Sequence, residues 1–481
     1  MTVAIRASRR ARRYDRERGC YVYDIAFKTA APLTERAVEV AEAFGLGLDE
    51  EQMHVLYRDF ELRLAEGDVV YITGDSGSGK SVLLRALKED LGPEAADMDE
   101  AGPPDPEAPI VDTVGATFQE ALRLLSMVGL GDAFLFLRRY GELSEGQRYR
   151  YRVARLIDLG RRFWLGDEFC STLDRCTARM VAYNVQRMVR RCGATLVVAT
   201  AHADLMDDLD PSIVIRKGWG REIGVEYRCG AAAEGCTVCR DVRVRVSGVE
   251  EYRRLSYLHY RAHEAPVPMG FYAVDVGGEL AGVIAYSYAP LRVKGRREAV
   301  GYVPDVGEVN RDWAAVSRVV VHPKYRGVGL GARLVRDSLP LVGRRHVELT
   351  AVMAQYNPFA ERAGMRRVLL AEPDVGVLGA VEALRGLGFS PAMLGSRAYS
   401  EGVLAGLGSV GRGALFDALC GLGGRYVRRL SRRKGFMGAG EFREWLGGQG
   451  AGSLAWTLQI LGTLAQAKVY LYWCRDWGVC T

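Results

Sequence analysis

One eight-residue motif limits the fold of this chain more than any other feature. A short apolar run, Val69–Thr73, is followed by G-D-S-G-S-G-K-S and then by a helical pattern. A strand, a glycine-rich loop and a helix in this order predict a phosphate-binding loop, because the glycines let backbone N–H groups face the phosphates. Lys80 is expected to reach the β- and γ-phosphates, and the Ser81 hydroxyl to ligate Mg2+. The residues assigned to the nucleotide are Gly74, Asp75, Ser76, Gly77, Ser78, Gly79, Lys80 and Ser81.

Length and charge set the scale of the molecule. The chain has 481 residues, of which 48% are hydrophobic, so it can bury large cores. A chain of this length suggests about two to four domains. The formal net charge is only +6, but arginines cluster in residues 6–18 and 425–434. These basic segments could contact nucleic-acid phosphates or form ordinary solvated surface, and charge alone does not separate the two.

The sequence carries no signal for a membrane or for secretion. Its closest approach to a membrane span, residues 454–473, is interrupted by Gln459, Gln466 and Lys468, which favours a packed helix. No apolar segment follows the N-terminal arginines. We therefore expect a cytoplasmic protein without a membrane partner, whose ten cysteines are thiols or metal ligands rather than disulfides.

A second buried strand ends in W-L-G-D-E, which places two carboxylates where phosphoryl transfer needs them. Asp167 is expected to hold the magnesium shell, and Glu168 to polarise the attacking water. The pair alone is a weak signal. Its neighbours strengthen it: L-S-E-G-Q (residues 143–147) precedes it, S-T-L-D (residues 171–174) follows it, and His202 comes just after the next strand.

In this order of motifs, residues 21–217 resemble the ATP-binding-cassette (ABC) family. The resemblance implies an ATP-sandwich homodimer, in which the signature motif of one subunit caps the ATP held by the other. It assigns Ser144, Gly146 and Gln147 to the partner's nucleotide, Asp174 to the dimer seam and His202 to the γ-phosphate side.

The sequence departs from the cassette pattern in several places. Glu145 stands where a glycine is usual, and residues 80–144 are shorter than the usual helical subdomain, which disfavours a transporter subunit. Gln119 does not fit the expected glutamine loop, which stays unassigned. For the aromatic residue that stacks on adenine, Tyr23, Phe27 and Tyr57 compete, and each is equally explained as core.

Three cysteines lie close together after the cassette-like region. Cys229, Cys236 and Cys239 could give three of the four ligands of a Zn2+ site, with His259, His263 or Cys474 as the fourth. The alternative is a set of thiols without metal, because a complete second C-x-x-C pair is absent.

A second glycine-rich loop follows a β-branched strand at residues 316–321. It reads H-P-K-Y-R-G-V-G-L-G, and N–H groups at the start of the next helix can bind a pyrophosphate. A predicted hairpin precedes it, at residues 271–276 and 280–287, and a strand at 347–353 follows. In this order, residues 242–367 resemble the GNAT acyltransferase family, in which the loop binds acetyl-coenzyme A. The residues assigned to the coenzyme are Val321, Arg326, Gly327, Val328, Gly329, Leu330 and Gly331.

The acyl-transfer residues are harder to assign. In many GNAT members a tyrosine four residues before the terminal glycine is the acid, but here Ala360 stands there, and Tyr356 is the substitute candidate. The frequent glutamate base is also missing. His259 and His263, on one face of a predicted helix, are expected either to act as a base or metal pair or to be structural.

The predicted fold class is α/β: a P-loop ABC ATPase domain (1–227), a cysteine junction (228–241), an α+β GNAT domain (242–369) and a mostly helical C-terminal region (370–481). The leading function is an ATP-dependent N-acyltransferase that transfers acetyl from acetyl-CoA to a macromolecule, with nucleic acid favoured. The alternative is a nucleic-acid-binding ABC ATPase whose GNAT domain binds but does not catalyse.

Overall fold

The computed structural model describes residues 6–29, 34–45, 52–228, 235–240, 242–259, 264–422, 424–431 and 437–476. It divides into two compact units. One contains Met1–Ser287 and Val316–Val342, and the other contains Tyr288–Ala315 and Gly343–Thr481.

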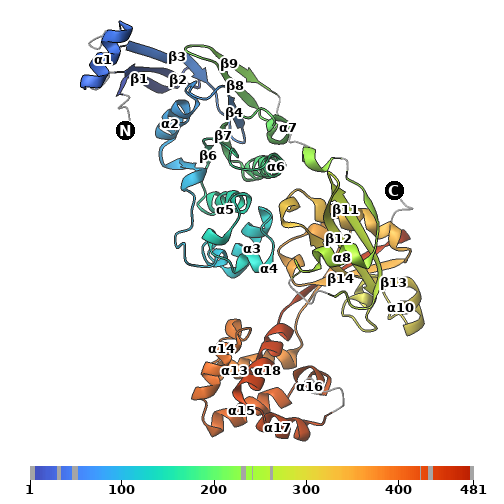
Figure 1. Ribbon diagram of the computed structural model, residues 1–481. Coiled ribbons are helices and arrows are strands. Elements are labelled where there is room, and N and C mark those ends of the chain that lie inside the picture. Colours follow the sequence, from blue (N-terminus) through green and yellow to red (C-terminus); the bar gives the residue numbers. More distant parts are fainter. Residues whose placement is uncertain are drawn as a thin grey trace. The chain divides into compact units, whose positions relative to one another are not determined.

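A six-stranded sheet organises residues 69–227 (Figure 1). Its order is β5-β6-β7-β4-β8-β9, and all neighbours are parallel except the edge strand β9, which is antiparallel to β8. The central strands are continuous apolar runs because both faces of the sheet are covered. The strands are β4 (Val69–Thr73), β5 (Ala95–Asp97), β6 (Phe163–Gly166), β7 (Thr195–Ala199), β8 (Ile213–Lys217) and β9 (Ile223–Tyr227).

Four of the helices associated with this sheet begin at a side chain that accepts a hydrogen bond from the first turn. The capping residues are Thr117, Asp132, Ser144 and Asp174, all of which are residue types that favour this position. The helices are α2 (Lys80–Leu91), α3 (Phe118–Met127), α4 (Ala133–Phe136), α5 (Glu145–Asp158), α6 (Arg175–Cys192) and α7 (Met206–Leu209).

A three-stranded antiparallel sheet precedes the six-stranded one, in the order β1-β2-β3. The arginine-rich start of the chain, Arg6–Asp15, forms the first strand of this sheet. Tyr23 and Tyr57 belong to one core with Val70 and Leu83. The elements are β1 (Arg6–Asp15), β2 (Cys20–Thr29), α1 (Glu35–Phe44) and β3 (Gln52–Leu62).

A seven-stranded sheet follows, in the order β10-β11-β12-β13-β14-β16-β15. β13 takes part in both units: its residues Trp313 to Ala315 pair with β14 in parallel, and its remaining residues belong to the first unit. The strands are β10 (Val244–Ser247), β11 (Pro268–Val276), β12 (Glu279–Tyr288), β13 (Trp313–Val321), β14 (His346–Ala351), β15 (Arg366–Ala371) and β16 (Lys468–Cys474). The helices are α8 (Val249–Ser256), α9 (Arg296–Val300), α10 (Val306–Asp312), α11 (Leu330–Ser338) and α12 (Phe359–Arg362).

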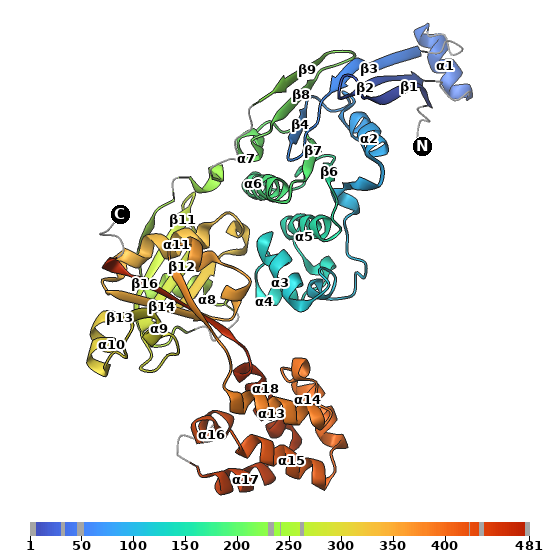
Figure 2. The same cartoon turned by 180° about the vertical axis from the view of Figure 1, so that it is seen from behind.

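The C-terminal region is mostly helical, as predicted, but its end is not. The six helices that lie between β15 and β16 in the sequence share one apolar core (Figure 2). The chain then returns to the sheet as β16, which is antiparallel to both β14 and β15. The packed helix predicted over 454–473 therefore ends at Leu464, and its last residues are strand. The helices are α13 (Val375–Gly386), α14 (Arg397–Gly406), α15 (Ser409–Cys420), α16 (Gly424–Ser431), α17 (Ala439–Gly447) and α18 (Ala451–Leu464).

None of the helices in the described ranges is both long and apolar enough to cross a membrane.

Candidate functional site

The first glycine loop, residues 74–79, lies between the buried strand β4 and helix α2. Gly74, Gly77 and Gly79 have φ angles of 143°, 78° and 105°, a region that side chains with a Cβ rarely adopt. A Cβ on Gly74 would also lie 2.0 Å from the carbonyl oxygen of Lys217. Glycine is therefore required here both by the backbone conformation and by the close approach of the neighbouring strand.

Polar groups point into this loop. The Nζ of Lys80 donates to the carbonyl oxygens of Gly74 and Asp75, both at 2.7 Å. Ser78 is buried, and its Oγ has no hydrogen-bond partner among the described residues. Ser81 stands in the first turn of α2. A lysine folded over the loop, an unpaired buried hydroxyl and a helix start fit a triphosphate with its Mg2+.

The two predicted carboxylates follow β6 in a strained turn. Glu168 and Cys170 have φ angles of 48° and 58°, which are unusual for residues with a side chain. The N–H of Glu168 donates to Oδ1 of Asp167 at 3.0 Å. Strained backbone of this kind is common at functional sites, which agrees with the roles assigned to this pair.

His202 follows β7, the strand between β6 and β4. Its N–H donates to Oγ1 of Thr200 at 3.2 Å, and the hydroxyl of Tyr71 donates to its carbonyl oxygen. Because β6, β7 and β4 are parallel neighbours, their C-terminal ends lie at one edge of the sheet. The structure therefore brings Lys80, Asp167, Glu168 and His202 to the same edge of the sheet.

The signature segment starts helix α5. Ser144 is its N-cap and forms a reciprocal capping box with Gln147. Glu145, the departure from the family pattern, pairs with Arg148 on the same helix at 2.5 Å. A carboxylate in the first turn also suits the helix dipole. The unusual residue is therefore accommodated locally.

Helix α6 starts at the predicted dimer-seam residue and packs against the signature. Asp174 is its N-cap and accepts from the N–H of Thr177 at 3.1 Å. A Cβ on Gly146 would lie 2.8 Å from Cγ2 of Thr177. The glycine of the signature thus allows the starts of α5 and α6 to approach each other closely.

The candidates for adenine stacking are not equivalent. The side chains of Tyr23 and Tyr57 are 0% and 1% exposed, so both belong to the core. The Tyr57 hydroxyl donates to the carbonyl oxygen of Gly79 at 3.0 Å and thereby stabilises the end of the loop. The side chain of Phe27 lies outside the described residues.

An aromatic residue that the sequence analysis missed lies beside the loop. Trp219 is 64% exposed, and a Cβ on Gly77 would lie 3.6 Å from its ring. The buried Nζ of Lys217 donates to the carbonyl oxygens of Gly218 and Gly220, at 2.8 and 2.7 Å, and holds this turn in place. The sequence pattern that could have indicated this residue is a tryptophan between two glycines, directly after a strand.

The second glycine loop, residues 322–331, joins β13 to α11. Gly327 and Gly329 have φ angles of 89° and 90°, and Gly329 is the N-cap of α11. Nε of Arg326 donates to the carbonyl oxygen of Val321 at 2.9 Å. A Cβ on Gly331 would lie 3.6 Å from the Val321 side chain. The strand, turn and helix order predicted for an anion-binding loop is present.

The acyl-transfer candidates differ in position and burial. Tyr356 is half-buried after β14, and Ala360 is completely buried in α12. Helix α8 ends at Ser256, so His259 lies beyond it in a turn, and the predicted shared helical face with His263 is wrong at this end. His263 itself lies outside the described residues.

The zinc hypothesis gains no support. Cys236 and Cys239 are buried, and Cys229 lies outside the described residues. In the part of the chain that the structure describes, no three His, Cys, Asp or Glu side chains gather in a way that could hold a metal ion.

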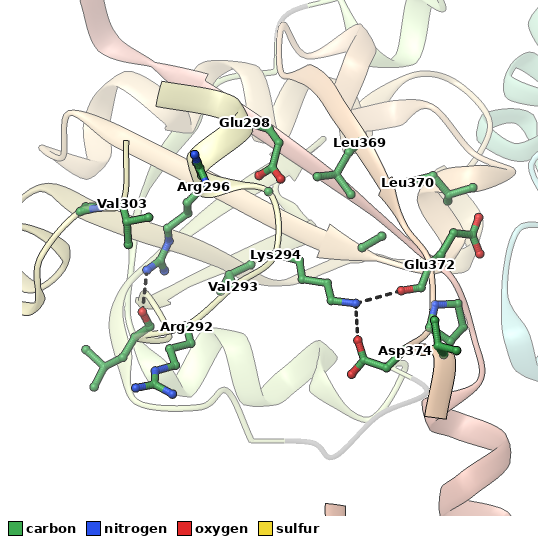
Figure 3. A pocket seen from close by; sticks show the side chains of 17 residues that line it. Arg292, Val293, Lys294, Arg296, Glu298, Val303, Leu369, Leu370, Glu372 and Asp374 are labelled. Carbon is green, nitrogen blue, oxygen red and sulfur yellow. Dashed lines mark hydrogen bonds and ion pairs between the residues drawn. The ribbon is translucent and has the colours of Figure 1, made fainter. Parts of the chain in front are cut away.

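A pocket of about 900 Å³ lies within the second unit, between residues 291–304 and the end of β15 (Figure 3). Lys294 joins its two walls, because its Nζ donates to Oδ1 of Asp374 at 2.7 Å and to the carbonyl oxygen of Glu372 at 3.1 Å. Next to it, Arg296 forms a buried ion pair with Glu348 at 2.6 Å. The pocket therefore has a mixed, ordered set of charges.

Comparisons with known proteins support the two families that the glycine loops indicate. The model of the Acetyltransferase (GNAT) family matches residues 240–365. The cytochrome c biogenesis ATP-binding export protein CcmA of Sphingopyxis alaskensis is 31% identical over 180 residues, which are 33% of this chain and 89% of that protein. The methionine import ATP-binding protein MetN of Nocardia farcinica is 27% identical, over 46% of this chain and 76% of its own length.

Among solved structures, the post-hydrolysis dimer of the ATP-binding cassette MJ0796 with ADP and Pi is similar to this chain at 21% identity. The match has a TM-score of 0.31 and covers 38% of this chain and 94% of that one. With the phosphate loop, the signature and the second glycine loop in place, this chain belongs to the ABC ATPase family and carries a GNAT acetyltransferase domain in the same polypeptide.

Proposed function

We propose that this protein is an ATP-dependent N-acyltransferase, which uses ATP hydrolysis by its cassette while it transfers acetyl from acetyl-CoA to an amine of a macromolecule. The observation that carries the proposal is the presence of two anion-binding glycine loops, one of each family, in a single chain. A working cassette needs the signature of a second subunit, so we also propose an ATP-sandwich homodimer. The cytoplasmic location stays a prediction.

On the ATPase side, the residues at the sheet edge divide the work. Lys80 and the loop N–H groups would hold the triphosphate, while Ser81 and Asp167 would hold Mg2+, which neutralises phosphate charge. Glu168 would orient and polarise the attacking water, and His202 would contact the γ-phosphate side. Ser144, Gly146 and Gln147 would complete the site of the other subunit.

On the acyl side, residues 326–331 would hold the pyrophosphate of acetyl-CoA through N–H groups at the start of α11. The acceptor amine must lose a proton as it attacks the thioester, and the departing thiolate must gain one. Tyr356 is our candidate for the acid.

For the acceptor we favour a nucleic acid. Arg428 and Arg429 are exposed on α16, in the middle of the second arginine cluster. Exposed arginines on one helix are suited to phosphate contacts. The remaining basic side chains of this cluster, at 425 and 432–434, lie outside the described residues.

One observation favours the alternative, in which the GNAT domain binds but does not catalyse. The position at which many members carry the acid is Ala360, and its side chain is completely buried. Saturable coenzyme A binding without transfer to any amine would select this alternative.

The test begins with ATP turnover by the purified full chain, without polymer and with duplex DNA, single-stranded DNA or RNA. Glu168→Gln is the control and should lower turnover at least about 100-fold, because the water loses its polarising group. A polymer that stimulates turnover would then be incubated with labelled acetyl-CoA and assayed for acetyl incorporation. If no polymer stimulates a Glu168-dependent basal rate, the nucleic-acid acceptor is wrong, and a protein or small amine takes its place.

A further inference from the structure

The second glycine loop is held by elements of the cassette. These contacts all lie within the first unit, which contains both the cassette and residues 316–342. They come from helices α5 and α6 and from the segment between α3 and α4. Helices α5 and α6 each start at a residue assigned to the ATP sandwich, so these contacts link the two ligand sites physically.

Helix α5 connects the signature to the start of the loop. It begins at Ser144, and six residues later Arg150 is buried, with 4% of the residue exposed. Its guanidinium donates to the carbonyl oxygens of Pro323 and Lys324, at 3.4 and 3.3 Å. Burial, with a smaller contribution from Arg326, lowers the pKa of Arg150 to about 10, so it stays charged at neutral pH. A buried cation thus holds two carbonyl groups at the start of the loop.

Helix α6 connects the dimer-seam residue to the centre of the loop. It begins after Asp174, and Arg187 on the same helix donates to the carbonyl oxygen of Gly327 at 2.8 Å. Arg187 also donates to Oδ1 of Asn184 at 2.8 Å, and Asn184 in turn donates to the carbonyl oxygen of Val128 at 2.7 Å. The loop glycine and the end of α3 therefore share one hydrogen-bond network.

The segment between α3 and α4 completes the interface. Asp132, the N-cap of α4, forms an ion pair with Arg326, and the two side chains are only 11% and 15% exposed. A Cβ on Gly129 would lie 2.8 Å from the Cα of Gly327, so the two backbones are in direct contact. Both glycines have positive φ angles, 88° and 89°. The loop cannot shift without changing these cassette contacts.

We infer that Asp132, Arg150 and Arg187 are positioning residues for the coenzyme A loop, through which nucleotide binding to the cassette changes the affinity for coenzyme A. The inference rests on the proposed function in one respect, that residues 326–331 bind the coenzyme. A nucleotide that moves the starts of α5 or α6 must also move the groups that hold Pro323, Lys324 and Gly327. Linkage requires the converse, so coenzyme A changes the affinity for ATP by the same factor.

The test measures binding alone, without an acceptor. Coenzyme A is titrated calorimetrically into the full-length Glu168→Gln protein with and without MgATP, and MgATP is titrated with and without coenzyme A. We expect the coenzyme A Kd to differ at least about fivefold between the two states, with an equal ratio in the reciprocal titration. Equal affinities in both states would overturn the inference.

Two variants test the assigned contacts. Asp132→Asn and Arg187→Gln should each bring the ratio of the coenzyme A Kd values with and without MgATP closer to one, while both ligands still bind. Arg190→Gln is the matched control, because Arg190 lies on the same helix but donates to Gln186 and Asp210 within the cassette. A ratio that survives in Asp132→Asn and Arg187→Gln, or that is lost in Arg190→Gln, contradicts the assignment.

The same titrations separate this inference from the proposed function. If coenzyme A does not bind in any state, the acyltransferase function fails, and the inference fails with it. If both ligands bind but independently, only the inference fails.

Discussion

At the scale of single residues, the most informative side chains are those that the surrounding backbone forces into unusual environments. Lys80 folds over its own loop, Ser78 keeps a buried hydroxyl without a partner among the described residues, and Glu168 has a positive φ angle. A positive φ angle and an unpaired buried hydroxyl each cost free energy and are common at functional sites. They occur together where the sheet edge presents the motifs, which supports the assignment of the nucleotide site there.

Trp219 offers a test at this scale. Its exposed ring lies beside Gly77, so MgATP bound to the loop should change its surroundings and its fluorescence. In the Glu168→Gln background, we expect MgATP to change the tryptophan emission, and Trp219→Phe to remove most of that change. Trp445→Phe is the control, because this residue stacks on Phe442 in the helical region. An ATP-induced change of full size in Trp219→Phe would show that the ring does not sense the nucleotide.

At the scale of elements, the second unit depends on a buried ion pair. Nε and Nη2 of Arg296 donate to the two carboxylate oxygens of Glu348 in β14, at 2.9 and 2.6 Å. The Tyr470 hydroxyl in β16 donates to the same carboxylate at 2.9 Å. Burial, and then the charge of Glu348, raise the pKa of Tyr470, which keeps this phenol protonated as a donor. The pair therefore joins α9 to two strands.

Loss of one partner of the Arg296–Glu348 pair should lower the free energy of unfolding far more than loss of both partners. Arg296→Met leaves a buried carboxylate without its cation, a change that typically costs about 3–5 kcal/mol. We expect faster hydrogen exchange in β14 of this variant and substantial recovery in Arg296→Met/Glu348→Leu. Arg253→Met, which breaks the exposed pair with Glu250, should cost less than about 1 kcal/mol. Equal exchange in the two single variants would refute the structural role of the buried pair.

At the scale of the whole molecule, the chain leaves the seven-stranded sheet and later returns to it. It leaves the sheet after β15, forms the helices α13–α18, and returns as β16 between β14 and β15. All six β14 residues and most of β15 find their partners in this last strand. The helical region is thus an insertion within the sheet rather than a tail after it.

Truncation tests this topology. A chain that ends at residue 467 lacks β16 and leaves backbone groups of β14 and β15 unpaired, which is costly in a buried sheet. We expect it to lose coenzyme A binding and to become protease-sensitive after residue 343, while it keeps ATP hydrolysis. A chain that ends at residue 476 retains β16 and should behave like the full protein. Normal coenzyme A binding by the shorter chain would show that β16 is dispensable.

The parts of this protein that can be read from its amino-acid order are those whose chemistry is local. The glycine loops, the carboxylate pair after β6 and the signature and S-T-L-D motifs are recognisable because each needs particular residue types at a fixed spacing. They were enough to predict two families in one chain and the residues assigned to ATP.

Features that depend on distant partners became visible only in the folded chain. The strand character of β16 comes from pairing with β14 and β15, because its apolar residues fit a helix or a strand equally well by pattern. The choice among the aromatics required burial, which no single segment encodes. The contacts of Arg150, Arg187 and Asp132 with a loop about 140 to 195 residues away arise from packing alone, and hydrogen bonding at such separations leaves no periodic trace in the sequence.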